Sequence, residues 1–390
     1  MTGQPAPPLH FDYVIAGGGC AGLSLAWQMQ QAGLLKTKHL LILDREAKSE
    51  NDRTWCFWEK EPGPFEHLVH HAWQHAWFFG PEWSEKMNLA PYRYKMIRGD
   101  AFYGFVKKAL SEEKNIRFAR EEVLEISDLG EKAGIQTTEN EYTADWIFNS
   151  IPPKTDKKKG HHYLLQHFTG WFIKTAGPFF NPEEPYLMDF RIEQKGECRF
   201  MYVLPTSPTE ALVEFTLFSE AHLPKKEYED ALRKYLEEFL HAGSFEIEHR
   251  EFGSIPMFSE PFPRGKGKRI VNIGTAGGQT KASTGYTFTR IQKHSKQLAE
   301  SLLNAGHPLL KPNKAAARHQ LYDRILLHVL ANKKAPASEV FQNLFKKNGA
   351  AAVLKMLKSF PFTIKYSSTF NFPTGRSAEV PRNVAVTDHP

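Results

Sequence analysis

Apolar and polar positions over the first fifty residues follow the order strand, turn, helix, strand. Residues 11–16 (FDYVIA) form a short apolar run, the stretch GGGCAG follows, and LSLAWQMQQAGLL has the length and propensity of a helix. A second apolar run, HLLILD, ends in Asp44 and is expected to lie parallel to the first across a right-handed connection. The pattern therefore predicts one βαβ unit.

The following hundred residues predict a loop and then regular structure. Residues 45–94 are rich in Trp and Phe without a clear period, and we expect a long functional loop there. Residues 99–110 have the period of an amphipathic helix. Strands are expected after it at NIRFAR, EEVLEISD, GIQTTE and ADWIFNS, so the first domain should close near Ser150.

The second half predicts an antiparallel sheet followed by a return to the first domain. Extended segments are expected at GWFIKT, YLMDFRIEQ, ECRFMYVLP and EALVEFTLFS, and an amphipathic helix over residues 224–243. RIVNIG then predicts a strand that leads into a Gly-rich loop and a long helix. We therefore expect an α/β chain with a discontinuous Rossmann-like domain (1–150 and 253–310), an antiparallel-sheet substrate domain (151–252) and a helical C-terminal region (311–390).

Composition narrows the protein class. The 390 residues carry a formal charge of +6, and the three cysteines lie far apart without metal-ligand spacing. No Lys or Arg precedes Lys36, so the charged region of a secretory signal is missing and a cytoplasmic location is expected. Residues 13–35 are uncharged but contain five glycines, which favours a buried βα unit over a membrane span.

Two polar clusters are interpreted as structural. His67, His70, His71 and His75 lack an Asp or Cys that would complete a ligand set, so no metal is expected. Residues 157–159 are three lysines with no aromatic stacking platform nearby, which is typical of a solvated linker rather than a nucleic-acid site.

A dinucleotide fingerprint follows the first strand. Gly17, Gly19 and Gly22 have the G-x-G-x-x-G spacing, in which glycines allow a tight turn, close approach of a pyrophosphate and close helix packing; Gly18 lies within the same turn. Asp44 ends the next strand, where its carboxylate is expected to accept hydrogen bonds from an adenosine ribose. The cofactor indicated is FAD or NAD.

A second Gly-rich stretch favours FAD. Gly274, Gly277 and Gly278 follow a late strand and lead into a helix, as in two-domain flavoproteins, whereas a nicotinamide-binding domain needs no such return. The alternative is an ordinary strand-to-helix turn. Thr275 stands where hydroxylases of this class usually carry an Asp, which counts against an ordinary hydroxylase.

Glu214 lies in an apolar strand. Strand alternation puts Leu212, Glu214, Thr216 and Phe218 on one face. Burial there should raise the carboxyl pKa, and a protonated acid in an apolar cavity is the proton donor that a hydrocarbon substrate requires. The alternative is an edge-strand Glu that points into water.

These segments together resemble the lycopene cyclase family of FAD flavoproteins over nearly the whole chain. The resemblance rests on GGGCAGLSLA, NDRTWCF at 51–57, the pair His70 and His71, FMYVLPTSPTEALVEFT, GSIPM and STGY. Lys281 and Ala282 replace the usual His and Pro before the last motif, and Phe215 replaces an acidic residue of many bacterial members. The ring type formed is left open by these departures.

The resemblance implies a reaction without net redox change. Lycopene is protonated, closes a six-membered ring and loses a proton to give a β-ionone ring, while FAD must be reduced, with NADPH or NADH as donor. It places the acid/base role on Glu214, substrate contacts on Trp55, Phe57, Trp58, Thr216 and Tyr286, and further cofactor contacts on Thr284 and Gly285. Trp55, Phe57 and Trp58 have core packing as an equal alternative to cation–π stabilisation.

Other classes remain open from the residues alone. A flavin monooxygenase or an isoprenoid reductase would use the same fold and consume reductant, and a non-catalytic carrier would bind isoprenoids unchanged. Lycopene resides in membranes, so peripheral binding at the inner face of the cell membrane is expected through the Lys-rich amphipathic segment 341–362. The alternative for that segment is packing on the protein's own surface.

Overall fold

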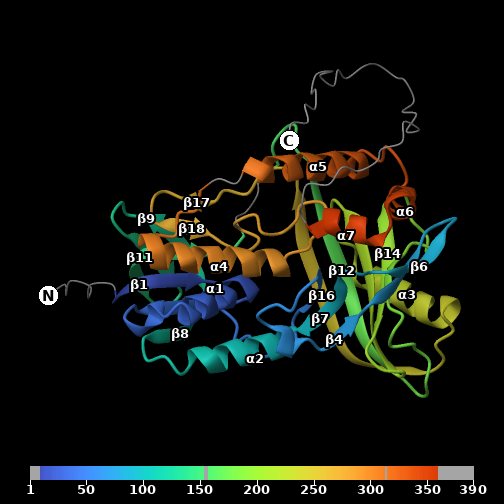
Figure 1. Cartoon of the computed structure of the whole chain (residues 1–390), viewed down its shortest axis with the longest axis horizontal. Coiled ribbons are helices and arrows are strands. Elements are labelled where there is room, and N and C mark those ends of the chain that lie inside the picture. Colours follow the sequence, from blue (N-terminus) through green and yellow to red (C-terminus); the bar gives the residue numbers. More distant parts are fainter. Residues whose placement is uncertain (1–8, 153–156, 312–313, 359–390) are drawn as a thin grey trace.

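The computed structural model describes residues 9–152, 157–311 and 314–358, and among these the chain is built around two large sheets (Figure 1). The first sheet has the order β17-β18-β11-β1-β2-β8, and β10 and β9 extend it beside β11. Its strands are β1 (Leu9–Ala16), β2 (Leu40–Asp44), β8 (Ile116–Arg120), β9 (Val123–Asp128), β10 (Ala133–Thr137), β11 (Glu141–Asn149), β17 (Gly265–Lys266) and β18 (Ile270–Asn272).

The predicted βαβ unit is confirmed. β1 pairs in parallel with β2, and α1 (Cys20–Gln31) connects them. Tyr13 and Ile15 face one hydrophobic cluster, while Val14 and Ala16 face another on the opposite side of the sheet. Both faces are therefore buried, which explains why these strands are continuous apolar runs. Helices α1, α2 (Gly99–Leu110) and α4 (Phe288–Ala305) lie together along one side of the sheet (Figure 1).

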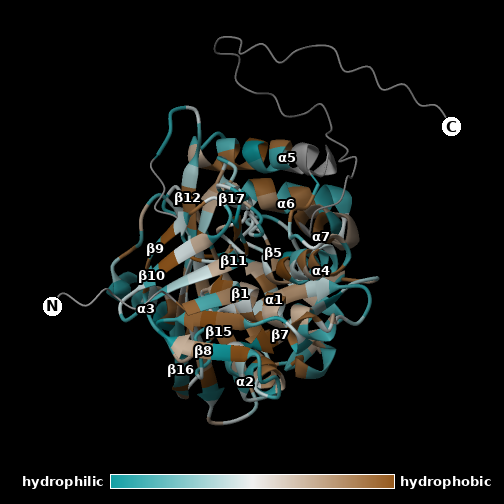
Figure 2. Cartoon of the chain, turned by 90° about the vertical axis from the view of Figure 1, so that its left-hand side faces the viewer, coloured by the Kyte–Doolittle hydropathy of each residue, from teal (hydrophilic) through white to brown (hydrophobic). Residues whose placement is uncertain are grey.

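The second sheet has the order β16-β12-β15-β14-β13-β5-β6. The expected antiparallel segments are confirmed as β12 (Tyr163–Thr175), β13 (Tyr186–Asp189), β14 (Cys198–Pro205) and β15 (Glu210–Ser219). The helix expected at 224–243 is α3 (Lys225–Lys234), continued by a π-helical turn, Tyr235–Phe239. Figure 2 shows hydrophobic residues concentrated on the central strands and hydrophilic ones along the outer loops.

The prediction of a long loop over residues 45–94 is wrong. This segment contains β3 (Thr54–Glu59), β4 (His71–Trp73), β5 (His75–Phe79) and β6 (Ser84–Asn88), and it leads into β7 (Arg93–Arg98). β3, β7 and β4 form a three-stranded sheet, and β5 joins the second sheet by parallel pairing with β13. Most of its aromatic side chains are buried, on both faces of the strands, so they show no simple alternation that would predict strands.

Strand pairing differs from the expected domain bounds in two places. Residues 75–88 form β5 and β6 of the second sheet, although they lie within 1–150. β16 (Phe245–Phe258) pairs with β12 along its whole length, so residues 253–258 also belong to the second sheet. The chain thus crosses between the two sheets more often than the sequence pattern predicts.

Helices α5 (Lys314–Ala331), α6 (Ala337–Asn348) and α7 (Ala350–Lys358) come after α4 in the chain and contact strands of the second sheet. Phe341, Phe345 and Leu354 are buried in the same cluster as Phe78 and Phe190. The apolar face of the segment expected to lie on lipid is therefore occupied by the protein's own core, as the packing alternative requires; residues 359–362 lie outside the described residues.

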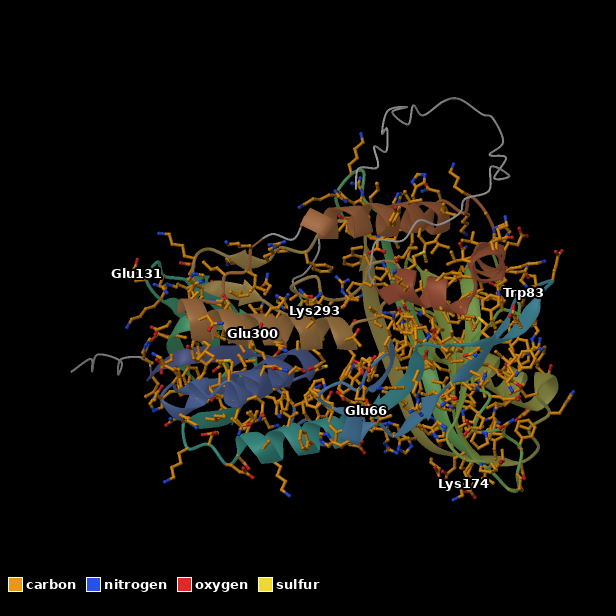
Figure 3. All side chains as sticks on the ribbon, viewed as in Figure 1. Glu66, Trp83, Glu131, Lys174, Lys293 and Glu300 are labelled. Atoms are coloured by element: carbon orange, nitrogen blue, oxygen red, sulfur yellow. The ribbon has the colours of Figure 1, made fainter. Side chains whose placement is uncertain are left out.

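The β5–β6 hairpin is tied to α6. The side-chain oxygen of Gln342 accepts hydrogen bonds from the backbone N–H groups of Glu82 (2.9 Å) and Trp83 (3.0 Å). Trp83 lies at the outer end of the molecule beside the helices of the C-terminal region (Figure 3). Among the described residues, no helix is both long and apolar enough to cross a bilayer.

Candidate active site

A cavity of about 700 Å³ lies between the carboxyl ends of the first sheet's strands and one face of the second sheet. This is the position at which open α/β sheets bind ligands. Nine of the residues expected in the site line it: Gly17, Gly19, Asp44, Trp55, Glu214, Gly274, Thr284, Gly285 and Tyr286. The other expected residues do not line it: Gly18, Gly22, Phe57, Trp58, Thr216, Gly277 and Gly278.

The glycine turn after β1 leaves space for a ligand. Gly17 has φ +99°, a left-handed conformation that favours glycine. A Cβ on Gly19, the N-cap of α1, would meet no atom within 4 Å, so this position opens into the cavity. A Cβ on Gly22 would instead collide with the carbonyl oxygen of Gly17, so Gly22 serves the close packing of helix on strand. The turn and the helix N-terminus suit a pyrophosphate.

Asp44 braces this turn. Its Oδ2 accepts a hydrogen bond from the backbone N–H of Gly18 (2.7 Å), and its Oδ1 accepts one from Glu46 (2.8 Å). The carboxylate also lines the cavity. It can therefore hold the turn and present a lone pair to a ribose hydroxyl at the same time.

The second Gly-rich stretch packs against the first. Gly274 has φ +59°, and a Cβ there would lie 2.7 Å from Cβ of Ala21 in α1. Gly277 is packed against the backbone of Asn272, and Gly278 has φ +76°. These two glycines shape the turn, while Gly285, with φ +72°, reaches the cavity itself.

The loop before STGY is closed by a buried ion pair. Lys281, which replaces the histidine usual in this motif, pairs with Asp323 of α5. Ser283 donates a second hydrogen bond to the same carboxylate oxygen (2.6 Å). Burial lowers the pKa of Lys281. The pair fixes the loop that carries Thr284 and Tyr286 to the C-terminal helices.

Glu214 lies on an interior strand. β15 pairs with β12 on one side and β14 on the other, so Glu214 is not an edge residue. Leu212 and Phe218 share its face and belong to one apolar cluster, whereas Val213 and Phe215 belong to another, as strand parity predicts. The carboxyl accepts a hydrogen bond from Thr216. Burial, and secondarily the charge of Glu251, raise the pKa of Glu214 to about 8.

The three aromatics of β3 have different surroundings. Trp55 lines the cavity. Phe57 stacks on Phe288 at 4.6 Å between ring centroids, inside the core of the first sheet. Trp58 packs edge-on against Tyr286 at 4.2 Å and donates its indole N–H to the carbonyl of Leu354 (2.9 Å). Phe57 and Trp58 therefore pack as core side chains, and Trp55 is the one of these three that faces the cavity.

Several site residues were not expected. Tyr94 and Tyr202 line the cavity, and burial raises the pKa of both hydroxyls. Glu251 on β16 is only 6% exposed and accepts a hydrogen bond from Thr54 Oγ1 (2.8 Å). Burial raises the pKa of Glu251 to about 7. The alternation of β16 gives only a partial signal: Arg250 next to it is exposed, but the pairing with β12 shifts register between His249 and Ile247.

The histidines do not form a helical pair. His67 lies in a 3₁₀ turn, Glu66–Leu68, and His71 begins β4, so the i, i+4 geometry is absent. Over residues 9–152, 157–311 and 314–358, no three His, Cys, Asp or Glu side chains are grouped as a metal site.

A family model described as "Lycopene cyclase protein" matches residues 12–353. The chain belongs to the lycopene cyclase family. Lycopene beta-cyclase of Pseudescherichia vulneris is 23% identical over 266 residues, which make up 63% of this chain and 61% of that protein. The resemblance drawn from the sequence is confirmed, and the match spans about three fifths of the length of that curated relative.

Solved structures agree on the fold. A geranylgeranyl bacteriochlorophyll reductase-like protein from Thermoplasma acidophilum has a TM-score of 0.65 at 12% identity, covering 88% of this chain and 92% of that one. p-Nitrophenol 4-monooxygenase PnpA from Pseudomonas putida has a TM-score of 0.62 at 12% identity, covering 91% and 100%. A flavoprotein/dehydrogenase from Cytophaga hutchinsonii has 0.61 at 15%, covering 90% and 92%. The expected two-domain flavoprotein fold is confirmed.

Proposed function

We propose that the protein is a lycopene β-cyclase that converts lycopene to β-carotene through γ-carotene. The observation that carries this proposal is a raised-pKa carboxyl, Glu214, facing a cavity that also contains a dinucleotide-binding turn. Protonation of a terminal double bond needs an acid that stays protonated near neutral pH, and Glu214 meets that condition. The ring-closed cation then loses a proton to a base, and Glu214 after its first step is a carboxylate at the same place.

The surroundings of Glu214 suit a hydrocarbon cation. Leu204, Leu212 and Phe168 line the cavity and exclude water from the reacting end of the chain. Trp55 and Tyr286 bring aromatic rings to the same cavity, where a ring face stabilises a positive charge. Thr216 orients the Glu214 carboxyl by its hydrogen bond.

FAD fits the open glycine turn, and we propose it as the resident cofactor. Gly17 and Gly19 would receive the pyrophosphate, Asp44 the adenosine ribose, and Gly274 with Gly285 the remainder of the cofactor. When bound and reduced with NADPH or NADH, FAD supplies negative charge that stabilises a carbocation electrostatically.

Pigment analysis in a host that accumulates lycopene tests the function. The wild-type gene should yield β-carotene, and Glu214→Gln should reduce its formation by about 10²-fold, the scale of a general acid–base group. Glu210→Gln is the matched control, because Glu210 lies on the same strand and pairs with Lys174 outside the cavity. β-Carotene formation by Glu214→Gln at the wild-type rate would contradict the role of Glu214.

An isoprenoid reductase or a monooxygenase is the second candidate, favoured by the likeness to solved structures with those names. Both consume reductant with every product molecule, whereas cyclisation does not. The number of NADPH molecules oxidised per product therefore separates the classes. An isoprenoid carrier would return lycopene unchanged.

We also propose that the protein takes lycopene from the membrane as a peripheral protein on the cytoplasmic face. The proposal follows from the substrate's residence in lipid and the net positive charge. Flotation with anionic vesicles at low salt should carry the protein upward. If the protein is absent from the floated fraction, this proposal is wrong.

A further inference from the structure

Two buried carboxylates lie in one row across the second sheet. On β12, Gly170 pairs with Glu214 of β15 on one side and with Glu251 of β16 on the other. Residues in one row of adjacent strands project to the same face, and two strand spacings separate them by about 10 Å. Glu214 and Glu251 therefore face the same side with one residue between them.

The residue between them has no side chain. A Cβ on Gly170 would lie 2.9 Å from Cδ1 of Leu212 and 3.1 Å from Cγ of Glu251. Any larger residue would displace one carboxylate or the apolar wall beside the other. The glycine thus leaves the two carboxyl groups without an intervening side chain, at a buried place where charges interact more strongly than in water.

The two carboxyls have different partners. Glu251 accepts a hydrogen bond from Thr54, and Arg53 and Arg98 lie close enough to favour its charged form. Glu214 accepts a hydrogen bond from the hydroxyl of Thr216, and the charge of Glu251 opposes its ionisation. The pair therefore ionises in order, with Glu251 as the carboxylate and Glu214 as the acid.

We propose that Glu251 is a positioning residue whose negative charge, held by Thr54, keeps Glu214 in the protonated form that the proposed cyclisation requires. This inference rests on the proposed function for its catalytic meaning. The other titratable or charged groups that face the pair are Asp52, Arg53, Arg98, Cys56, Tyr202 and Tyr286. Arg53 and Arg98 stabilise the charge on Glu251, and Asp52 opposes it.

The pH dependence of cyclisation tests the proposal. In the FAD-loaded protein, Glu251→Gln should move the alkaline limb of the rate profile about one unit toward acid, the effect of one charge at about 10 Å and an effective dielectric constant of about 20. The rate should fall about fivefold at pH 8 and less than twofold at pH 6. Glu251→Asp keeps the negative charge, so its rate profile should lie close to that of the wild type.

A matched control lies on the same strand. Glu248 is exposed and has no partner on β12 in the register of β16, so Glu248→Gln should leave the profile unchanged. A uniform loss of rate at every pH in Glu251→Gln, with normal FAD content, would assign Glu251 a structural role and overturn the proposal.

A second measurement does not depend on cyclisation. The infrared band of the protonated carboxyl, assigned by its loss in Glu214→Gln, should titrate about one unit lower in Glu251→Gln than in the wild type. If the band titrates as expected but the wild type does not convert lycopene, the proposed function is wrong, while the coupling between Glu214 and Glu251 is supported. An unshifted band would overturn the pairing. If Glu251→Gln does not fold, Thr54→Val should lower the band's midpoint in the same direction, and no change there would also overturn it.

Discussion

Glu214 should make the folded protein less stable as the pH rises. Its pKa is about 8 in the folded chain against an ordinary value of 4.5. Below pH 4.5 both states are protonated and the group has no effect. Above it the unfolded chain ionises while the folded chain does not, so the free energy of unfolding falls until the pH reaches about 8. The full shift corresponds to roughly 5 kcal/mol at 1.36 kcal/mol per unit, of which roughly 3.5 kcal/mol falls between pH 5 and pH 8.

Glu214→Gln removes the ionisable group and with it this loss of stability, so the variant should be more stable but less active than the wild type. The variant should gain roughly 3.5 kcal/mol over the wild type between pH 5 and pH 8 while losing cyclisation. Urea unfolding followed by tryptophan fluorescence, at pH 5, 6, 7 and 8 and at equal FAD saturation, measures the difference. Glu210→Gln, a change on the same strand outside the cavity, is the control. A difference for Glu214→Gln that does not vary with pH would mean that Glu214 ionises normally, and the proton-donor argument would fail.

Three further variants test other parts of the site. Gly19→Val should give colourless protein, because its side chain would enter the open space at the turn, whereas Gly104→Val on the exposed side of α2 should remain yellow; retained flavin in Gly19→Val contradicts the assignment. Asp323→Asn should lower the free energy of unfolding by about 3 kcal/mol, measured by urea titration, because it leaves the buried Lys281 ammonium without its carboxylate. Phe345→Ala should cost about 3 to 5 kcal/mol of stability in the same assay without reducing flotation on anionic vesicles, since Phe345 is buried in the core.

The sequence predicted the parts of the fold that local pattern determines. The βαβ unit, α2 and the strands around Glu214 follow from period and turn residues alone. The strands β3 to β6 were missed because they are short and aromatic, and because β5 reaches its partner β13 across more than a hundred residues. Such pairing is decided by packing against distant segments and leaves no local signal.

The residues of the candidate site also fall into those that the local sequence identifies and those that only the fold reveals. Gly17, Gly19, Asp44 and Glu214 were identified because each has a signature in its own strand or turn, and the structure brings all four to one cavity. Glu251 has a weaker signal because a register shift interrupts the alternation of β16, and its importance appears only when Gly170 is seen to pair with both Glu251 and Glu214. A relation across three strands cannot be read from any one of them.

The shared fold does not decide between redox and non-redox chemistry. Proteins named as a reductase and a monooxygenase align with almost the whole chain at 12% identity. The dinucleotide turn belongs to the first sheet, whereas both raised-pKa carboxyls belong to the second, on strands β15 and β16. Because function resides in sites carried by a fold, the side chains on this face of the second sheet, and not the shared fold, are what can distinguish proton transfer from redox chemistry. The identity of residues 214, 170 and 251 is therefore the feature on which the proposed reaction depends.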